Sequence, residues 1–316
     1  MPLVDMPLAD LERYEGRNPR PADFDAFWDR SLGESAALPL NATTTSASFE
    51  CRSAVAEDLF FDGTDGARIY AKLLRPKRPN GAAIVSFHGY SSHAGDWSDY
   101  LNWVAEGFTV AAMDCRGQGG RSTDPGGVSG TTLRGHIVRG LGDAPEKLYY
   151  RNVFLDCERL VRVVADLPDV DGGRIASIGG SQGGGLALAC AALAPIKKTA
   201  PRYPFLCDYL RVWEMDLDVN AYEELRYWFR NFDPLHRRHD EVFTQLGYVD
   251  VQHLAPRIGA QTMMAATLLD SITPPSTIFA AYNKISAPKR VVTYPDFGHE
   301  GLPLFNDLTF DFLRDL

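Results

Sequence analysis

An α/β fold, with a mainly parallel central sheet flanked by helices, is the class that this 316-residue sequence predicts. The first observation is that short apolar runs of strand length alternate with helical stretches from residue 81 onward. Buried strands that alternate with helices are typical of a parallel sheet. The second observation is a globular composition, with 45% hydrophobic and 23% charged residues. The third is that no internal repeat or low-complexity linker divides the chain, so we expect one domain over residues 1–316.

Residues 1–55 are expected to form a lead-in segment that precedes the alternating pattern. Within it, "RPADFDAFWDRSL" predicts a short amphipathic helix with two phenylalanines and a tryptophan on its apolar face. The next stretch, "EDLFFDGTDGARIYAKLLRP", predicts a β-hairpin, because Asp65-Gly66 supplies a turn between two runs rich in β-forming residues.

The remaining elements follow from the apolar runs and their spacing. Residues 207–255 break the alternation and are rich in aromatic and charged side chains, which predicts a helical insertion that covers the site. The strands that we expect are residues 81–89, 108–115, 174–180, 196–206, 260–270 and 289–297. The helices that we expect are residues 97–106, 151–167, 184–194, 275–283 and 306–316.

Charge and cysteine usage narrow the class of partner and the compartment. The formal net charge of −9, with no long lysine and arginine cluster, argues against nucleic acid and membrane surfaces as partners. No signal-peptide pattern is visible at the start, and no apolar run reaches the ~18 residues of a membrane span. The five cysteines include no C-x-x-C pair, which favours reduced thiols over disulfides or a zinc site. We therefore expect a cytoplasmic chain.

Five glycines crowd around Ser181 in "ASIGGSQGGGLALACA". Residues 179–183 fit G-x-S-x-G between an expected strand and an expected helix, which is the setting of a nucleophile elbow. In that turn the residues beside the serine must lack bulk, and the hydroxyl emerges where open α/β sheets bind ligands. The alternative is a glycine-rich turn with an incidental serine. We interpret Ser181 as a nucleophile.

A serine hydroxyl needs a base, and in this arrangement the acid and the histidine follow the serine in the chain. His299 is the expected base, because it follows the last expected strand and would lie at the edge that carries Ser181. Asp270 is the expected acid, because it ends a strand that reaches the same edge. Asp296 is its rival, but a residue so close to His299 in the chain would have difficulty reaching the Nδ1 atom of that ring.

The other histidines after Ser181 have simpler interpretations. His236 and His239 form "HRRH" and would share one solvated helical face; a metal site is the alternative, but no further ligands accompany them. His253 is expected to be an exposed polar residue. We expect no metal and no cofactor.

Acyl transfer also needs hydrogen-bond donors for the oxyanion. The elbow supplies the backbone N–H of Gln182, and the loop "FHGYSS" points to the backbone N–H of Tyr90 as the second donor. His88 precedes the serine and is expected to shape this loop instead of acting as a base.

These residues carry a resemblance to a known family. The chain resembles carbohydrate esterase family 7, the acetyl xylan esterase and cephalosporin C deacetylase family. The resemblance covers nearly the whole chain. It lies in Arg116-Gly117-Gln118, in the serine motif at residues 179–183 and in His299-Glu300, with "FHGY", "GHIVRG", "KLYYRNV", "PPSTIFAAYN" and "PADFDAFW" as flanking agreements.

The resemblance implies an α/β-hydrolase fold and a triad of Ser181, His299 and Asp270, with oxyanion donors at the Tyr90 and Gln182 amides. It implies removal of acetyl groups from short xylo-oligosaccharides and from the acetoxymethyl arm of cephalosporins. It also implies a cytoplasmic homo-oligomer, often a hexamer.

The resemblance also bears on residues around the triad. Arg116, Gly117 and Gln118 are expected to be structural, tying a long loop to the catalytic face. Thr273 is a departure, because relatives often carry cysteine before the Pro-Pro pair. Two rival functions stay open: a general carboxylesterase or peptidase of the same fold, and a non-catalytic ligand-binding module.

Overall fold

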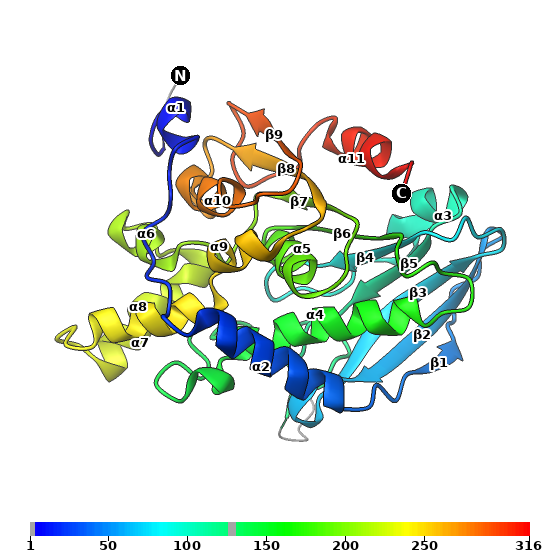
Figure 1. Cartoon of the computed structure of the whole chain (residues 1–316), viewed down its shortest axis with the longest axis horizontal. Coiled ribbons are helices and arrows are strands. Elements are labelled where there is room, and N and C mark those ends of the chain that lie inside the picture. The colour runs from blue at the N-terminus through cyan, green and yellow to red at the C-terminus, as the bar shows by residue number, and fades with distance from the viewer. Residues whose placement is uncertain (1–3, 126–130) are drawn as a thin grey trace.

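A nine-stranded sheet runs through the middle of the computed structural model, which describes residues 4–125 and 131–316 (Figure 1). Within those residues the strand order is β1-β2-β3-β5-β4-β6-β7-β8-β9. The six strands from β4 to β9 are mutually parallel, which confirms the expected fold class. Their bounds are β4 Ala83–Phe87, β5 Thr109–Met113, β6 Ile175–Gly180, β7 Lys198–Arg202, β8 Gln261–Thr267 and β9 Lys289–Tyr294.

The antiparallel edge of the sheet contains the expected hairpin. Strands β2 (Ala54–Asp62) and β3 (Arg68–Pro76) pair antiparallel, and β3 then pairs with β5. Asp65 and Gly66 turn the chain with φ angles of 53° and 77°, a left-handed conformation that Gly adopts freely and Asp tolerates. The outermost strand, β1 (Thr43–Ser46), was not expected, because all four of its residues are exposed and give no hydrophobic pattern.

Helices cover both faces of the sheet. Helices α4 (Tyr149–Ala165), α5 (Gln182–Leu193) and α10 (Pro275–Tyr282) pack on one face. Helices α3 (Leu101–Ala105) and α11 (Phe305–Leu313) lie on the other, where Trp103 and Phe310 stack with ring centroids 5.5 Å apart. A 3-10 turn at Trp97–Tyr100 leads into α3.

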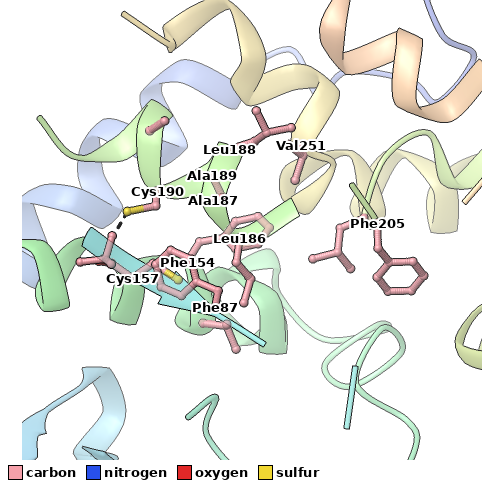
Figure 2. Close-up of a cluster of buried hydrophobic side chains, with 14 of the residues drawn as sticks. Phe87, Phe154, Cys157, Leu186, Ala187, Leu188, Ala189, Cys190, Phe205 and Val251 are labelled. Carbon is pink, nitrogen blue, oxygen red and sulfur yellow. Dashed lines mark hydrogen bonds between the residues drawn. The ribbon is translucent and has the colours of Figure 1, made fainter. Parts of the chain in front are cut away.

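The core between the sheet and α4 and α5 consists of buried apolar side chains. Phe87 of β4, Phe154 of α4 and Leu186 of α5 meet there (Figure 2), each with at most 3% of its surface exposed. Cys157 and Cys190 are fully buried in the same cluster, as their apolar helical pattern predicts. This packing fixes α5 against the strands, and α5 begins directly after Ser181.

The lead-in segment packs against the helical insertion, residues 207–255. Helix α2 (Phe24–Ala37) places Trp28 so that its Nε1 donates to the Tyr248 carbonyl at 3.0 Å. The Asp208 carboxylate accepts the backbone N–H groups of Arg17 and Asn18 at 3.0 and 2.8 Å. Residues 1–3 of the lead-in and residues 126–130 of the long loop lie outside the described residues.

Residues 207–255 are helical, as the sequence predicts. Figure 1 shows α6 (Tyr209–Glu214), α7 (Glu223–Phe232) and α8 (His239–Leu246) gathered at one end of the molecule. A one-turn helix, α9 (Val251–Leu254), returns the chain to β8, and another single turn, α1 (Leu8–Leu11), lies near the N-terminus. Among the described helices, none has the length and apolar character needed to cross a bilayer.

Candidate active site

The turn between β6 and α5 holds Ser181 in a conformation that L-residues rarely adopt, with φ of 57° and ψ of −122°. Glycine makes this turn possible. A Cβ on Gly179 would lie 2.3 Å from the Gly183 carbonyl oxygen, and a Cβ on Gly183 would lie 2.0 Å from the Phe87 carbonyl oxygen. Strand and helix therefore approach as closely as they do only because these two side chains are absent, and the serine is the strained residue between them.

The structure brings Ser181, His299 and Asp270 into one hydrogen-bonded chain. The Nε2 atom of His299 lies 3.0 Å from Oγ of Ser181. Its Nδ1 atom lies 2.8 Å from Oδ2 of Asp270. The three residues come from the ends of β6, β8 and β9 or from the loops that follow them, and these strands are parallel, so all three meet at one edge of the sheet.

Asp270 is completely buried and fully hydrogen-bonded. Its Oδ1 atom accepts the backbone N–H groups of Ile272 and Thr273 at 2.8 and 2.9 Å, and its Oδ2 atom accepts the hydroxyls of Thr267 and Thr273 at 3.1 and 2.9 Å. Burial alone would raise the pKa of this carboxyl. The hydrogen bond and charge of His299, with the two N–H groups, outweigh burial and hold the pKa of Asp270 below its usual range.

Thr273, the residue that departs from the family pattern, contributes directly to this arrangement. Its hydroxyl donates to Asp270 and lies 3.3 Å from Nδ1 of His299. The threonine helps to satisfy the buried carboxylate.

The rival acid and the other histidines lie elsewhere. Asp296 is exposed and makes no hydrogen bond to His299. His236 precedes α8 with φ of 52° and stacks on Phe229 at 4.6 Å, so it does not share a helical face with His239. His253 was expected to be exposed, but only 5% of it is, and its Nε2 lies 3.1 Å from the Asn18 carbonyl oxygen. Burial lowers the pKa of His253 to about 3.

Two backbone N–H groups beside Ser181 are available to a ligand. Gln182 is the first residue of α5, and the first N–H groups of a helix have no partner within it. The N–H of Tyr90 donates to no acceptor in the part of the chain that the structure describes. Phe87 and Gly179 are register partners in β4 and β6, so the loops that carry Tyr90 and Ser181 leave neighbouring strands at the same level. The two expected oxyanion donors therefore follow adjacent parallel strands.

His88 shapes the loop before Tyr90. Its Nε2 accepts the backbone N–H of Cys115 at 2.9 Å, so the proton lies on Nδ1, which donates to the Gly89 carbonyl at 2.7 Å. Both ring nitrogens are occupied and neither faces Ser181. Burial lowers the pKa of His88, which keeps the ring neutral.

The phenol of Tyr90 makes a contact that sequence reasoning missed. Its hydroxyl donates to the Glu224 carboxylate, which is only 4% exposed. The same carboxylate accepts the N–H of Ile137 at 2.7 Å. Burial raises the pKa of Glu224 to about 7, although the amides of residues 135–138 oppose the shift. In the sequence, Glu224 is one acidic residue among many in the insertion, and no pattern distinguishes it.

The Arg116-Gly117-Gln118 motif is buried and ties the site's loops together. Arg116 forms a two-pronged ion pair with Asp156 of α4, with distances of 2.7 and 2.6 Å. Gln118 donates from Nε2 to the Gln182 side chain at 2.8 Å and accepts the N–H of Ser91 at 2.8 Å. Gly117 has φ of 62°, which favours glycine. The motif thus braces Gln182, which is one expected oxyanion donor, and Ser91, which follows the other.

A cavity of about 520 Å³ opens beside Ser181 and His299. Its walls come from the loop after β4, from α3, from the end of β7 and from α11. Tyr203 lines it and packs against the His299 ring with centroids 4.6 Å apart. Within the described residues, 207–255 contribute nothing to this wall, so the expectation that the insertion covers the site is wrong. Tyr203, which lines the cavity, lies just before the insertion in the chain. Among the described residues of the insertion, Glu224 is the one that contacts the oxyanion loop, through the Tyr90 hydroxyl.

No cluster of three or more metal-ligating side chains occurs in residues 4–125 and 131–316. The site holds a hydroxyl, an imidazole and a buried carboxylate in one hydrogen-bonded series, with two N–H groups beside them. This arrangement can form and break an acyl-serine bond.

The sheet, the strained serine turn and the order Ser, Asp, His define the chain as an α/β-hydrolase. Over residues 1–316 it matches the family described as acetyl xylan esterase (AXE1). The chain therefore belongs to the acetyl xylan esterase family, a family of carboxylic ester hydrolases.

Three relatives show how similar the chain is to known proteins. Acetyl xylan esterase 1 from Thermoanaerobacterium sp. JW/SL YS485 is 50% identical, with a TM-score of 0.95 over 98% of this chain and 99% of that one. The acetyl xylan esterase from Paenibacillus sp. R4 is 39% identical, with a TM-score of 0.92 over 98% and 99%. Acetyl esterase Axe7A from Xylanibacter ruminicola is 27% identical over 87% of this chain, which spans 62% of that protein's length.

Proposed function

We propose that the chain is a serine esterase that removes acetyl groups from small acetylated substrates, namely short xylo-oligosaccharides and the acetoxymethyl arm of cephalosporins. The single observation that carries the proposal is the hydrogen-bonded series from Ser181 through His299 to Asp270, beside two backbone N–H groups that donate to no acceptor among the described residues. Family membership and the two acetyl xylan esterases of similar structure support acetyl as the acyl group.

The reaction that this geometry supports is a double displacement. Oγ of Ser181 attacks the acetyl carbonyl carbon while Nε2 of His299, 3.0 Å away, takes the hydroxyl proton. The N–H groups of Tyr90 and Gln182 donate to the oxyanion that forms. The carbon–oxygen bond to the alcohol then breaks, and His299 returns the proton to the leaving oxygen.

Hydrolysis of the acetyl-serine repeats the same steps with water. His299 accepts a proton from water as the water oxygen attacks the acetyl carbonyl, and it returns the proton to Oγ of Ser181 as acetate leaves. Asp270 accepts the hydrogen bond of Nδ1–H throughout, which fixes the tautomer that presents Nε2 to the serine. All of these proton transfers use groups of the chain and water.

The residues that line the cavity favour a substrate with a short acyl group. Beside Ser181 it carries polar side chains, among them His93, Asn102 and Asn306, and the Tyr203 ring closes the space next to His299. An apolar groove would favour longer chains by about 0.8 kcal/mol per buried CH₂, but a polar wall offers no such gain. Forcing extra methylenes against packed side chains costs about 1–3 kcal/mol.

A chain-length series tests the proposal. We expect kcat/KM to fall from p-nitrophenyl acetate to butyrate to octanoate, by about tenfold for each 1.4 kcal/mol of crowding. Ser181→Ala is the control and should abolish both hydrolysis and labelling by a fluorophosphonate. A rise toward octanoate would replace the proposal with a general carboxylesterase, and a wild-type chain that takes no fluorophosphonate label would indicate a non-catalytic binding module.

The compartment and the oligomeric state of the enzyme are part of the same proposal. The family resemblance suggests a cytoplasmic homo-oligomer, with a hexamer as the expected form. Three exposed apolar side chains of the insertion, Tyr227, Phe232 and Leu235, support self-association, since each leaves more than 60% of its surface uncovered. Sedimentation of the purified chain measures the assembly directly, and a monomer at micromolar concentration would contradict this part of the proposal.

A further inference from the structure

Arg202 occupies the end of β7, immediately beside the nucleophile. Its backbone carbonyl accepts the N–H of Ser181 at 3.1 Å. Its guanidinium lies over Gly180, the residue before Ser181, since a Cβ built on that glycine would be 3.4 Å from the Nε atom of Arg202. The side chain is partly buried and lines the same cavity as Ser181 and His299. A positive charge is therefore fixed in the wall that a substrate touches.

This guanidinium has no counter-ion in the described ranges, 4–125 and 131–316. No carboxylate there lies within 4.0 Å of it, and no side chain or carbonyl accepts a hydrogen bond from it. Arg116, by contrast, donates from Nε and Nη2 to both oxygens of the Asp156 carboxylate, at 2.7 and 2.6 Å. Partly buried guanidinium groups with five N–H donors are normally hydrogen-bonded, because removing them from water otherwise costs free energy.

The other charged groups of the cavity do not neutralise Arg202. Asp99 is exposed and accepts the N–H of Asp96 at the start of the turn before α3. His88 is neutral and has both ring nitrogens occupied. Among the described residues that line this cavity, the fixed charges are those of Arg202 and Asp99, and Arg202 is the one whose backbone binds Ser181 directly, while the chain as a whole carries a net charge of −9.

We propose that Arg202 binds a carboxylate on the alcohol part of the substrate. This inference rests on the proposed function, because an acetyl group carries no charge and the carboxylate must then belong to the alcohol. The planar guanidinium can hold a carboxylate through two parallel N–H···O bonds, which orients the ester as well as attracting it. A uronic acid unit on a xylo-oligosaccharide and the carboxylate of a cephem nucleus both supply this group.

A pair of matched acetates tests Arg202. The probes are 4-acetoxybenzoate, which is an anion, and 4-acetoxybenzamide, which is neutral and of nearly the same shape. For each enzyme we take the ratio of kcat/KM for the anion to that for the amide, so that the different leaving groups cancel when variants are compared. We expect Arg202→Gln to lower this ratio by about three- to tenfold, as for a partly exposed ion pair, and Arg202→Glu to lower it further.

The control is Arg78→Gln. Arg78 is an exposed arginine without an ion pair among the described residues, and it lies in the loop that enters β4, at the edge of the sheet opposite Ser181. This variant should keep the wild-type ratio. If both Arg202 variants fail to fold, the wild-type chain still gives a test, since raising the salt from about 0.01 M to about 1 M screens an accessible ion pair and should lower the ratio.

The outcomes separate the two proposals. A wild-type chain that hydrolyses both probes, with a ratio that neither Arg202→Gln nor salt changes by more than twofold, overturns the role of Arg202 and leaves the esterase intact. A wild-type chain that hydrolyses neither probe overturns the esterase and this inference with it. Repeating the ratio with acetylated oligosaccharides that do or do not carry a uronic acid, and with a cephalosporin acid and its methyl ester, identifies the source of the carboxylate.

Discussion

Gly183→Ala is the substitution that most directly tests how the serine turn is built. Gly183 has an ordinary helical conformation in α5, so the backbone itself permits alanine, which has the higher helix propensity by about 1 kcal/mol. Only space forbids it. The new methyl carbon would lie 2.0 Å from the Phe87 carbonyl oxygen and 2.7 Å from the Phe87 carbonyl carbon.

The magnitude follows from that overlap. An ordinary contact needs well over 3 Å, so the end of β4 or the start of α5 must move by more than an ångström, and both are buried backbone. We expect a loss of about 3 kcal/mol in the free energy of unfolding, at the upper end for an overpacked core. Because Phe87 leads into the loop that carries Tyr90, esterase activity should fall as well.

Urea unfolding followed by tryptophan fluorescence measures the loss through the shift in midpoint. The matched control is Gly33→Ala in α2, an exposed helical glycine whose added Cβ would meet nothing within 4 Å. That variant should raise the free energy of unfolding by about 0.5–1 kcal/mol, so the same glycine-to-alanine substitution is expected to stabilise the chain at residue 33 and destabilise it at residue 183. A Gly183→Ala chain as stable and active as the wild type would refute the steric explanation of the turn.

Three further predictions concern the acid, the oxyanion loop and pH. Asp270→Asn should lower kcat by about 10⁴-fold through the wrong histidine tautomer, whereas Asp296→Asn should leave the ester assay nearly unchanged; the reverse order would transfer the acid role. Tyr90→Phe and Glu224→Ala should each lower kcat by about tenfold, and the double variant should lower it no further, because the two substitutions remove the same hydrogen bond. If the two losses add in the double variant, Glu224 does not act through the Tyr90 phenol. Burial raises the pKa of Asp250 to about 7, so the protonated carboxyl stabilises the folded state at low pH, and this stabilisation is lost as the pH rises from about 4 through 7. Asp250→Asn should therefore make the fall in melting temperature between pH 5 and pH 8 less steep, and a fall as steep as in the wild type would contradict the raised pKa.

The parts of the fold that could be predicted are those with a repeating pattern. The parallel strands and their helices follow from apolar runs, and the turn at Ser181 follows from glycines that have no other use. Strand β7 shows the limit. Its apolar run continues to residue 206, but the strand ends at Arg202 because Tyr203 and Leu206 take positive φ angles of 30° and 68°. Left-handed conformation at such residues is imposed by tertiary packing and leaves no mark in the sequence.

Contacts between segments distant in the chain were beyond prediction. Nothing near His253 in the sequence indicates that the lead-in segment will cover it and supply the Asn18 carbonyl as its partner. The same holds for Glu224, whose partner Tyr90 lies 134 positions earlier. The placement of the insertion beside the site, and not over it, depends on how its helices pack against residues 14–28. Periodicity describes one element at a time and carries no information about these pairings.

Helix α11 gives the cavity a wall that is separate from the catalytic machinery. Phe305, Asn306 and Thr309 line the space beside Ser181, yet none of them touches the hydrogen-bonded series of the site. The helix is attached at its far end, where Lys198 donates to the Phe312 carbonyl at 2.7 Å. Exchanging exposed residues in the first turn of α11, such as Asn306, would therefore alter which alcohols are admitted while the bond-breaking chemistry stays with the sheet.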